Sequence, residues 1–192
     1  MRDLDIRRAL RTETKHRHRN EPDTLILEEL GLCLGIARID LAVVNGSLHG
    51  YEIKSERDTL DRLPGQADIY NQTLDYVTIV IAESHAHKVR MQVPEWWGIW
   101  SAIQRGQDIE LTCTRGSTRN PRVNPFALAQ LLWRDEALRA LIDRGLSDGM
   151  LSKPRIELWS RLASELTVED LGNVVRESLK RRVDWLIPAS QA

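Results

Sequence analysis

The chain has 192 residues, of which 42% are hydrophobic and 29% are charged, and its formal net charge is −1. This length suits one domain of ordinary size, or a core with an appendage, and the composition suits a folded, soluble protein. No segment reaches the roughly 18 to 20 apolar residues that a membrane span needs, and no apolar run of signal-peptide length opens the chain. Because Cys33 and Cys113 show neither zinc-site nor redox spacing, we expect free thiols in a cytoplasmic protein without a membrane partner.

The near-zero net charge conceals an uneven distribution along the chain. Residues 1–20 carry seven Lys/Arg and three Asp/Glu, residues 21–120 carry nine and fifteen, and residues 121–192 carry eleven and ten. A basic arm therefore precedes an acidic middle segment and a nearly balanced tail. Near-neutrality does not exclude a nucleic-acid partner, but any such binding is expected to be local, through the arm and the tail.

Residues 1–120 show a mixed α/β pattern. Alternating apolar runs, turn dipeptides and capping residues predict the order of elements. We expect a short helix over residues 3–10, a polar loop over 12–21 and a second helix from Asp23, closed by Gly31 and Gly35. A hairpin follows, with strands over 37–44 and 48–55 joined by Asn45-Gly46. The remaining elements are a helix over 64–74, a strand over 76–82, a short helix over 85–92 and strands over 98–104 and 109–114.

From Pro121 onward the apolar period becomes helical. Asn124-Pro125 opens a helix that Gly145 closes, and Thr167 caps a later one. The two predicted apolar stripes are Leu128, Leu131, Leu132, Leu138, Leu141 and Ile142, and Leu171, Val174, Val175, Leu179, Val183 and Leu186. We therefore divide the chain into a core over residues 1–120 and a helical extension over residues 121–192.

Charged residues lie within two predicted strands that are otherwise apolar, where burying a charge is energetically unfavourable. Asp40 lies within an apolar run, and Glu52 and Lys54 share one face of the next strand because they are two residues apart. Antiparallel pairing across the short turn brings Asp40 towards Glu52, and two buried carboxylates are unfavourable together. A divalent cation resolves that conflict, since Mg²⁺ prefers oxygen ligands, and a neighbouring lysine suits metal-assisted phosphodiester hydrolysis.

An Asp followed twelve residues later by Glu-x-Lys across a hairpin resembles the PD-(D/E)XK nuclease superfamily, with its restriction-endonuclease-like fold. Gln66 and Tyr70 form a Q-x-x-x-Y that resembles the RecB-like branch. Stretches such as Gly50–Ser55 and Pro94–Gly98 also resemble a small bacterial family of predicted nucleases of unassigned biology. The first motif departs from the superfamily pattern, because Arg38-Ile39 rather than a proline precedes Asp40.

The resemblance implies a metal-dependent nuclease that hydrolyses DNA, with a role in repair, recombination or phage-related defence. It implies Mg²⁺ or Mn²⁺ as cofactor and DNA as partner, beside a homodimer contact or a protein partner. The implied catalytic residues are Asp40, Glu52, Lys54, Gln66 and Tyr70. The implied metal ligands are Glu29, Asp40 and Glu52.

A cross-strand ion pair is the alternative interpretation of Asp40, Glu52 and Lys54, since an E-x-K tripeptide is often an ion-pair partner. Nucleic-acid contacts are expected from a basic C-terminal cluster and from the N-terminal arm. The residues concerned are Arg176, Lys180, Arg181 and Arg182, and Arg7, Arg8, Arg11 and Lys15. Their alternative is a solvated helix face.

The sequence therefore predicts an α/β fold, a restriction-endonuclease-like mixed sheet core flanked by helices, with a C-terminal all-helical extension. The predicted activity is that of a Mg/Mn-dependent nuclease. The alternative function is a non-catalytic DNA- or protein-binding module on the same fold, because fold alone does not decide function.

Overall fold

The computed structural model describes residues 1–182 and contains a single six-stranded sheet. The strands are β1 (Leu25–Leu32), β2 (Ala37–Val44), β3 (Leu48–Lys54), β4 (Tyr76–Ala82), β5 (Gly98–Arg105) and β6 (Asp108–Arg115). Their order in the sheet follows the chain, β1 to β6. The β1–β2, β2–β3 and β5–β6 pairs are antiparallel, whereas β3–β4 and β4–β5 are parallel. Each parallel pair is joined by a helical crossover, as parallel strands require.

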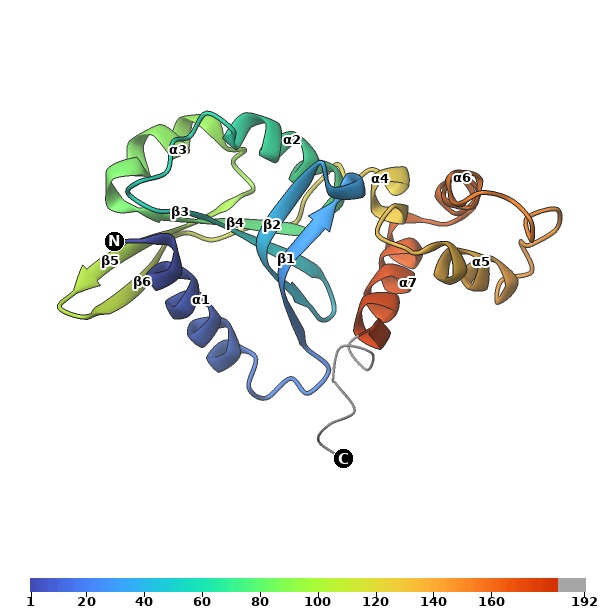
Figure 1. Cartoon of the computed structure of the whole chain (residues 1–192), viewed down its shortest axis with the longest axis horizontal. Helices are drawn as coiled ribbons and strands as arrows, with labels where there is room; N and C mark the ends of the chain where they lie inside the picture. The colour runs from blue at the N-terminus through green and yellow to red at the C-terminus, as the bar shows by residue number, and fades with distance from the viewer. Residues whose placement is uncertain (183–192) are drawn as a thin grey trace.

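Helices cover both faces of the sheet, as Figure 1 shows. Helix α1 (Asp3–Arg17) lies on one face, and α2 (Leu63–Thr73) and α3 (Ala86–Gln92) lie on the other. Short 3-10 turns, η1 (Cys33–Gly35) and η2 (Glu83–His85), complete this part. The helices α4 (Pro125–Ala129), α5 (Arg134–Ile142), α6 (Arg155–Glu165) and α7 (Val168–Arg181) gather beside the sheet. The predicted mixed α/β fold with helices at its C-terminal end is thus confirmed.

Two apolar clusters hold these layers together. The smaller one joins Ile6 and Leu10 of α1 to the sheet, and both side chains are fully buried. The larger one lies on the opposite face and continues from α2 into the C-terminal helices, where it includes Leu171 and Val175. Burial of these side chains is the main stabilising contribution of each layer. The division of the chain near residue 120 stays a prediction, and one continuous apolar cluster crosses that boundary.

Three expected elements differ in the structure. The helix predicted from Asp23 is wrong, because residues 25–32 form strand β1, which pairs with β2 from Leu25 to Leu32. The apolar spacing there also fits a helix, and the ladder with β2 decides between them. Helix α1 continues to Arg17, through much of the expected loop. The helix predicted after Pro125 is divided into α4 and α5.

The predicted stripe on α7 is only partly within the described residues. Leu171, Val175 and Leu179 are buried, while Val183 and Leu186 lie outside residues 1–182. Across the described part of the chain, the helices are all too short or too polar to traverse a lipid bilayer.

We predict that Gly50→Ala destabilises the protein. Gly50 lies in β3 against the α2 face of the sheet, where an added Cβ would lie 2.6 Å from Leu74 Cδ1 and 2.9 Å from Ile39 Cγ1. Because close-packed side chains must shift to admit it, the free energy of unfolding should fall by roughly 1–3 kcal/mol. Urea unfolding measures this change.

The matched control is Gly46→Ala in the β2–β3 turn, where the added Cβ meets no atom within 4 Å. This variant should change the free energy of unfolding by less than about 1 kcal/mol. Equal effects of the two substitutions would contradict the packing argument.

Candidate functional site

Three carboxylates lie in a row across three adjacent strands, and we call Glu29, Asp40 and Glu52 the carboxylate row. The pairs on either side in β1 and β2 place Glu29 opposite Asp40. Extending the β2–β3 register by one residue places Asp40 opposite Glu52. Like charges directly opposite one another on neighbouring strands are destabilising. The row must therefore be neutralised if the sheet is to be stable.

Asp40 lies where the regular ladder between β2 and β3 ends. The last bridged pair is Leu41 with Tyr51. Two residues further along β3, the backbone N–H of Ile53 donates to Asp40 Oδ2 at 2.7 Å. Asp40 Oδ1 accepts a hydrogen bond from Arg7 Nη2, also at 2.7 Å. Asp40 thus replaces a backbone acceptor in the ladder and holds α1 against the sheet.

Burial raises the pKa of Asp40 to about 6, and the nearby Glu52 carboxylate acts in the same direction. The hydrogen bond from Ile53 and the Arg7 guanidinium lower the pKa without cancelling this effect. Burial also lowers the pKa of Arg7, but the carboxylates of Asp40, Asp3 and Glu29 outweigh burial, and the net pKa is raised. Arg7 accordingly carries its positive charge at every physiological pH.

Glu29, on strand β1, is the second carboxylate of the row that contacts Arg7. Its Oε1 lies 2.7 Å from Arg7 Nη1, and its Oε2 lies 2.5 Å from Arg38 Nε. Its backbone has φ of 57°, in the left-handed region that non-glycine residues seldom adopt. Such a conformation costs on the order of 1–3 kcal/mol and persists only where surrounding contacts enforce it. The two arginines supply such contacts.

Glu52 sits in a separate, buried polar network on the α2 side. Its Oε1 accepts hydrogen bonds from Lys54 Nζ at 2.6 Å and from Gln66 Nε2 at 2.7 Å. Its Oε2 accepts one from the Tyr70 hydroxyl at 2.7 Å. Glu52 and Lys54 are only 2% and 4% exposed. Burial, followed by the charge of Glu52, strongly raises the pKa of Tyr70, so the phenol stays protonated and donates.

Helix α2 supplies two of the three partners of Glu52, and the helical repeat places both on one face. Gln66 and Tyr70 are four residues apart on one helix face, and Gln66 Nε2 lies 3.2 Å from the Tyr70 hydroxyl. Gln66 Oε1 also accepts a hydrogen bond from Lys54 Nζ at 2.9 Å. The structure thus brings together the five residues that the sequence grouped, Asp40, Glu52, Lys54, Gln66 and Tyr70.

The carboxylate row borders a cleft of about 830 Å³. Further acidic residues line it, namely Asp3, Asp58 and Asp61, together with Arg38 and Arg62. Asp58 accepts hydrogen bonds from the backbone and the hydroxyl of Ser55, so it closes the local turn.

The row does not fit a divalent cation as its side chains are arranged. All six carboxylate oxygens of Glu29, Asp40 and Glu52 already have protein partners: those of Asp40 and Glu52 accept hydrogen bonds, and those of Glu29 form ion pairs with two arginines. Three cations, those of Arg7, Arg38 and Lys54, balance the three negative charges. Within residues 1–182, no group of three or more His, Cys, Asp or Glu side chains is arranged to hold a metal ion. The Mg²⁺ or Mn²⁺ cofactor stays a prediction that this geometry does not favour.

Arg7 is the site residue whose role sequence reasoning missed. The sequence places it in the basic arm, as a candidate phosphate contact, whereas its side chain is only 16% exposed and binds three carboxylates, those of Asp3, Glu29 and Asp40. Its position next to the apolar Ile6 on a short amphipathic helix was the sequence feature that could have indicated a contact with the sheet.

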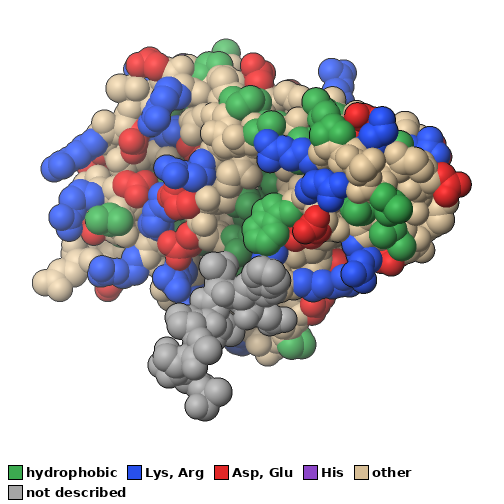
Figure 2. Space-filling view, turned by 45° about the vertical axis from the view of Figure 1, so that its right-hand side comes forward, with side chains coloured by type: hydrophobic (Ala, Val, Ile, Leu, Met, Phe, Trp, Pro, Cys, Tyr) green, Lys and Arg blue, Asp and Glu red, His purple; other side chains and the backbone are tan. Residues whose placement is uncertain are grey.

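The basic residues near the C-terminus are mostly held by internal partners. Arg176 is buried against Asp75, Lys180 binds Asp23 and Arg182 binds Glu136. Arg181 is exposed. Figure 2 shows basic and acidic side chains interleaved on this side of the molecule rather than a uniform basic field. A nucleic-acid-binding role for this cluster stays a prediction.

Two comparisons with known proteins bear on the family. A family model described as bacteriophage P4 protein cII matches residues 6–185. Protein cII of Enterobacteria phage P4 is 29% identical over 161 residues, which cover 83% of this chain and 60% of that protein. The chain therefore spans 60% of the length of this relative. No solved structure matches.

These findings overturn the nuclease interpretation. Both point to the cII protein and neither points to a PD-(D/E)XK nuclease, a RecB-like branch or a bacterial nuclease family. The predictions of nuclease activity, of a hydrolase and of a DNA-cleaving enzyme are wrong. An Asp and a Glu-x-Lys across a hairpin also build an ion-pair network, which is the arrangement found here.

We predict that Tyr70→Phe destabilises the protein by about 1–3 kcal/mol. The substitution removes the donor to Glu52 Oε2 and leaves a buried carboxylate oxygen unpaired. Tyr76→Phe is the control, because the Tyr76 hydroxyl makes no hydrogen bond within residues 1–182 and the residue is half-buried. Chemical denaturation of both variants measures the difference, and a Tyr70→Phe protein as stable as Tyr76→Phe would contradict this role.

We also predict a pH-dependent contribution from Asp40. Its pKa is raised from 3.8 to about 6, so the folded state holds this proton more tightly than the unfolded chain does. The resulting stabilisation is complete below about pH 4 and is lost as the pH rises through 6. The difference in unfolding free energy between wild type and Asp40→Asn should fall by roughly 2–3 kcal/mol from about pH 4 to about pH 7.5.

Urea titrations of both proteins at several pH values in this range measure the Asp40 contribution. Taking the difference between the proteins removes the titration of the remaining carboxylates. A difference that stays constant with pH would show that the pKa of Asp40 is not raised in the folded state.

Proposed function

We propose, from the premise that the chain belongs to the family of bacteriophage P4 protein cII, that it is a non-catalytic DNA-binding protein. The observation that carries the proposal is a basic face on α1. Arg8, Arg11 and Lys15 recur at spacings of three and four residues, and Arg19 follows just beyond the helix end. We call these four residues the cationic stripe. Their side chains are all exposed.

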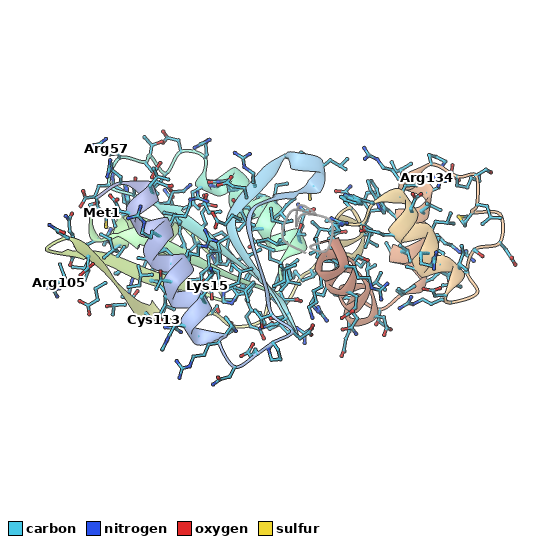
Figure 3. All side chains as sticks on the ribbon, turned by 60° about the horizontal axis from the view of Figure 1, so that its bottom comes forward. Met1, Lys15, Arg57, Arg105, Cys113 and Arg134 are labelled. Atoms are coloured by element: carbon cyan, nitrogen blue, oxygen red, sulfur yellow. The ribbon has the colours of Figure 1, made fainter. Side chains whose placement is uncertain are left out.

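The cationic stripe is presented on a helix with a fixed position. Ile6 and Leu10 bury the opposite face of α1, and Arg7 binds Asp40 at its side. Figure 3 shows α1 lying across the front of the sheet, with Lys15 labelled on it. From Arg8 to Lys15 the stripe extends about 10 Å at the rise of a helix, which is long enough to meet more than one phosphate of a duplex.

Two of the four residues of the stripe are uncommitted. Within residues 1–182, Arg8 and Lys15 take part in no ion pair, whereas Arg11 lies 3.0 Å from Glu28 and Arg19 Nη1 lies 2.8 Å from His16 Nε2. Beside the helix, a groove of about 240 Å³ is lined by Leu4, Arg7, Arg8, Arg11 and Glu28. Free cations fixed on a rigid surface bind phosphates without first breaking internal pairs, and such contacts supply most of the sequence-independent affinity for DNA.

The proposal also covers the compartment, which we expect to be the cytoplasm. Cys33 and Cys113 are free thiols, which suits the cytoplasm. The homodimer or protein partner stays a prediction.

The test is the salt dependence of binding to a labelled double-stranded oligonucleotide, followed by fluorescence anisotropy. The wild type should bind at low salt, with an affinity that falls linearly on a double-logarithmic scale. Arg8→Gln/Lys15→Gln should weaken binding and reduce the magnitude of that slope by about 2, because two phosphate contacts are lost.

Lys88→Gln/Arg90→Gln is the matched control. It removes the same charge from exposed positions on α3, on the opposite face of the sheet, and should leave the slope unchanged. Absence of DNA binding by the wild type, or equal losses in the two double variants, would overturn the proposal.

A further inference from the structure

We propose that the Arg7 guanidinium is the resident cation of the carboxylate row and occupies the position that a divalent cation would need. Its Nη1 lies 2.7 Å from Glu29 Oε1, and its Nη2 lies 2.7 Å from Asp40 Oδ1. One planar group thus joins acids from two neighbouring strands, as a bridging cation does. The inference goes beyond DNA binding and does not depend on it, because Arg7 faces the sheet while the cationic stripe faces solvent.

The fold delivers this cation without a ligand from solution. Ile6 and Leu10 are fully buried on either side of Arg7 along α1, so the guanidinium is tethered beside the row at high effective concentration. The Arg7 Nη1 atom also donates to the Asp40 carbonyl oxygen at 3.1 Å, which fixes the orientation of the guanidinium plane. Mg²⁺ demands near-octahedral oxygen ligands and retains several waters, so it would have to displace both contacts.

Removal of the guanidinium should convert the row into a divalent-cation site. Glu29 Oε1 and Asp40 Oδ1 would then face one shared space without a cation between them. The second oxygens would keep their partners, Arg38 for Glu29 and the Ile53 N–H for Asp40, so the two carboxylates would remain in place. Two fixed carboxylate oxygens and water are a ligand set that Mg²⁺ and Mn²⁺ accept.

The test is a titration with MnCl₂, in which free Mn²⁺ is measured by electron paramagnetic resonance. The compared proteins are the wild type, Asp40→Asn, Arg7→Met and Arg7→Met/Asp40→Asn. Methionine keeps an unbranched apolar stem for packing and removes the charge. We expect Arg7→Met to bind one Mn²⁺ per chain at least about tenfold more tightly than the wild type. The double variant should lose this gain.

Two outcomes would overturn the inference. One is a wild-type protein that binds Mn²⁺ as tightly as Arg7→Met does and loses it in Asp40→Asn. The other is a folded Arg7→Met protein, verified by circular dichroism, with no gain in Mn²⁺ binding. If Arg7→Met does not fold, Arg7→Gln takes its place with the same expected gain, and the comparison of the wild type with Asp40→Asn still decides whether Asp40 holds a metal in the native chain.

Discussion

The contact between Arg7 and Asp40 links α1 to strands β2 and β3 at the candidate site. It fixes α1 on the sheet, and it neutralises a carboxylate that also caps the end of the β2–β3 ladder through the Ile53 N–H. Because the single Asp40 carboxylate serves both purposes, a change in the docking of α1 also affects the end of the β2–β3 ladder. A partly buried ion pair of this kind is not a large net source of stability, but loss of one partner leaves an uncompensated charge.

Much of the sheet could be predicted from the sequence. The apolar runs of β2, β3 and β4 and the Asn45-Gly46 turn are local signals, and they placed those strands and α2 close to where they lie. Strand β1 could not be predicted, because Leu25, Ile26 and Leu30 fit a helical period as well as a strand. Only pairing with β2, a tertiary contact, distinguishes the two.

In the candidate site, too, some features follow from local sequence signals and others depend on tertiary contacts. The grouping of Asp40, Glu52 and Lys54 follows from strand alternation and a short turn, both of which are local. The nuclease activity assigned to them was wrong, as the family comparison shows. The charge balance of the site could not be predicted either, because it depends on Arg7, which lies 33 residues before Asp40 in the chain. A carboxylate pattern indicates a metal only when no cation of the protein reaches it. Tertiary structure decides that condition, and the spacing of the acids does not.

The long sequence separations of these contacts also determine the order in which the native structure can be completed during synthesis. Helix α1 is synthesised before its partners on β2 and β3, so it cannot dock until the hairpin has formed. At the other end, Arg176 binds Asp75 across 101 residues of sequence. The apolar surface beneath α7 consequently stays open until α7 has been synthesised, and apolar surface that is open during synthesis is prone to aggregation.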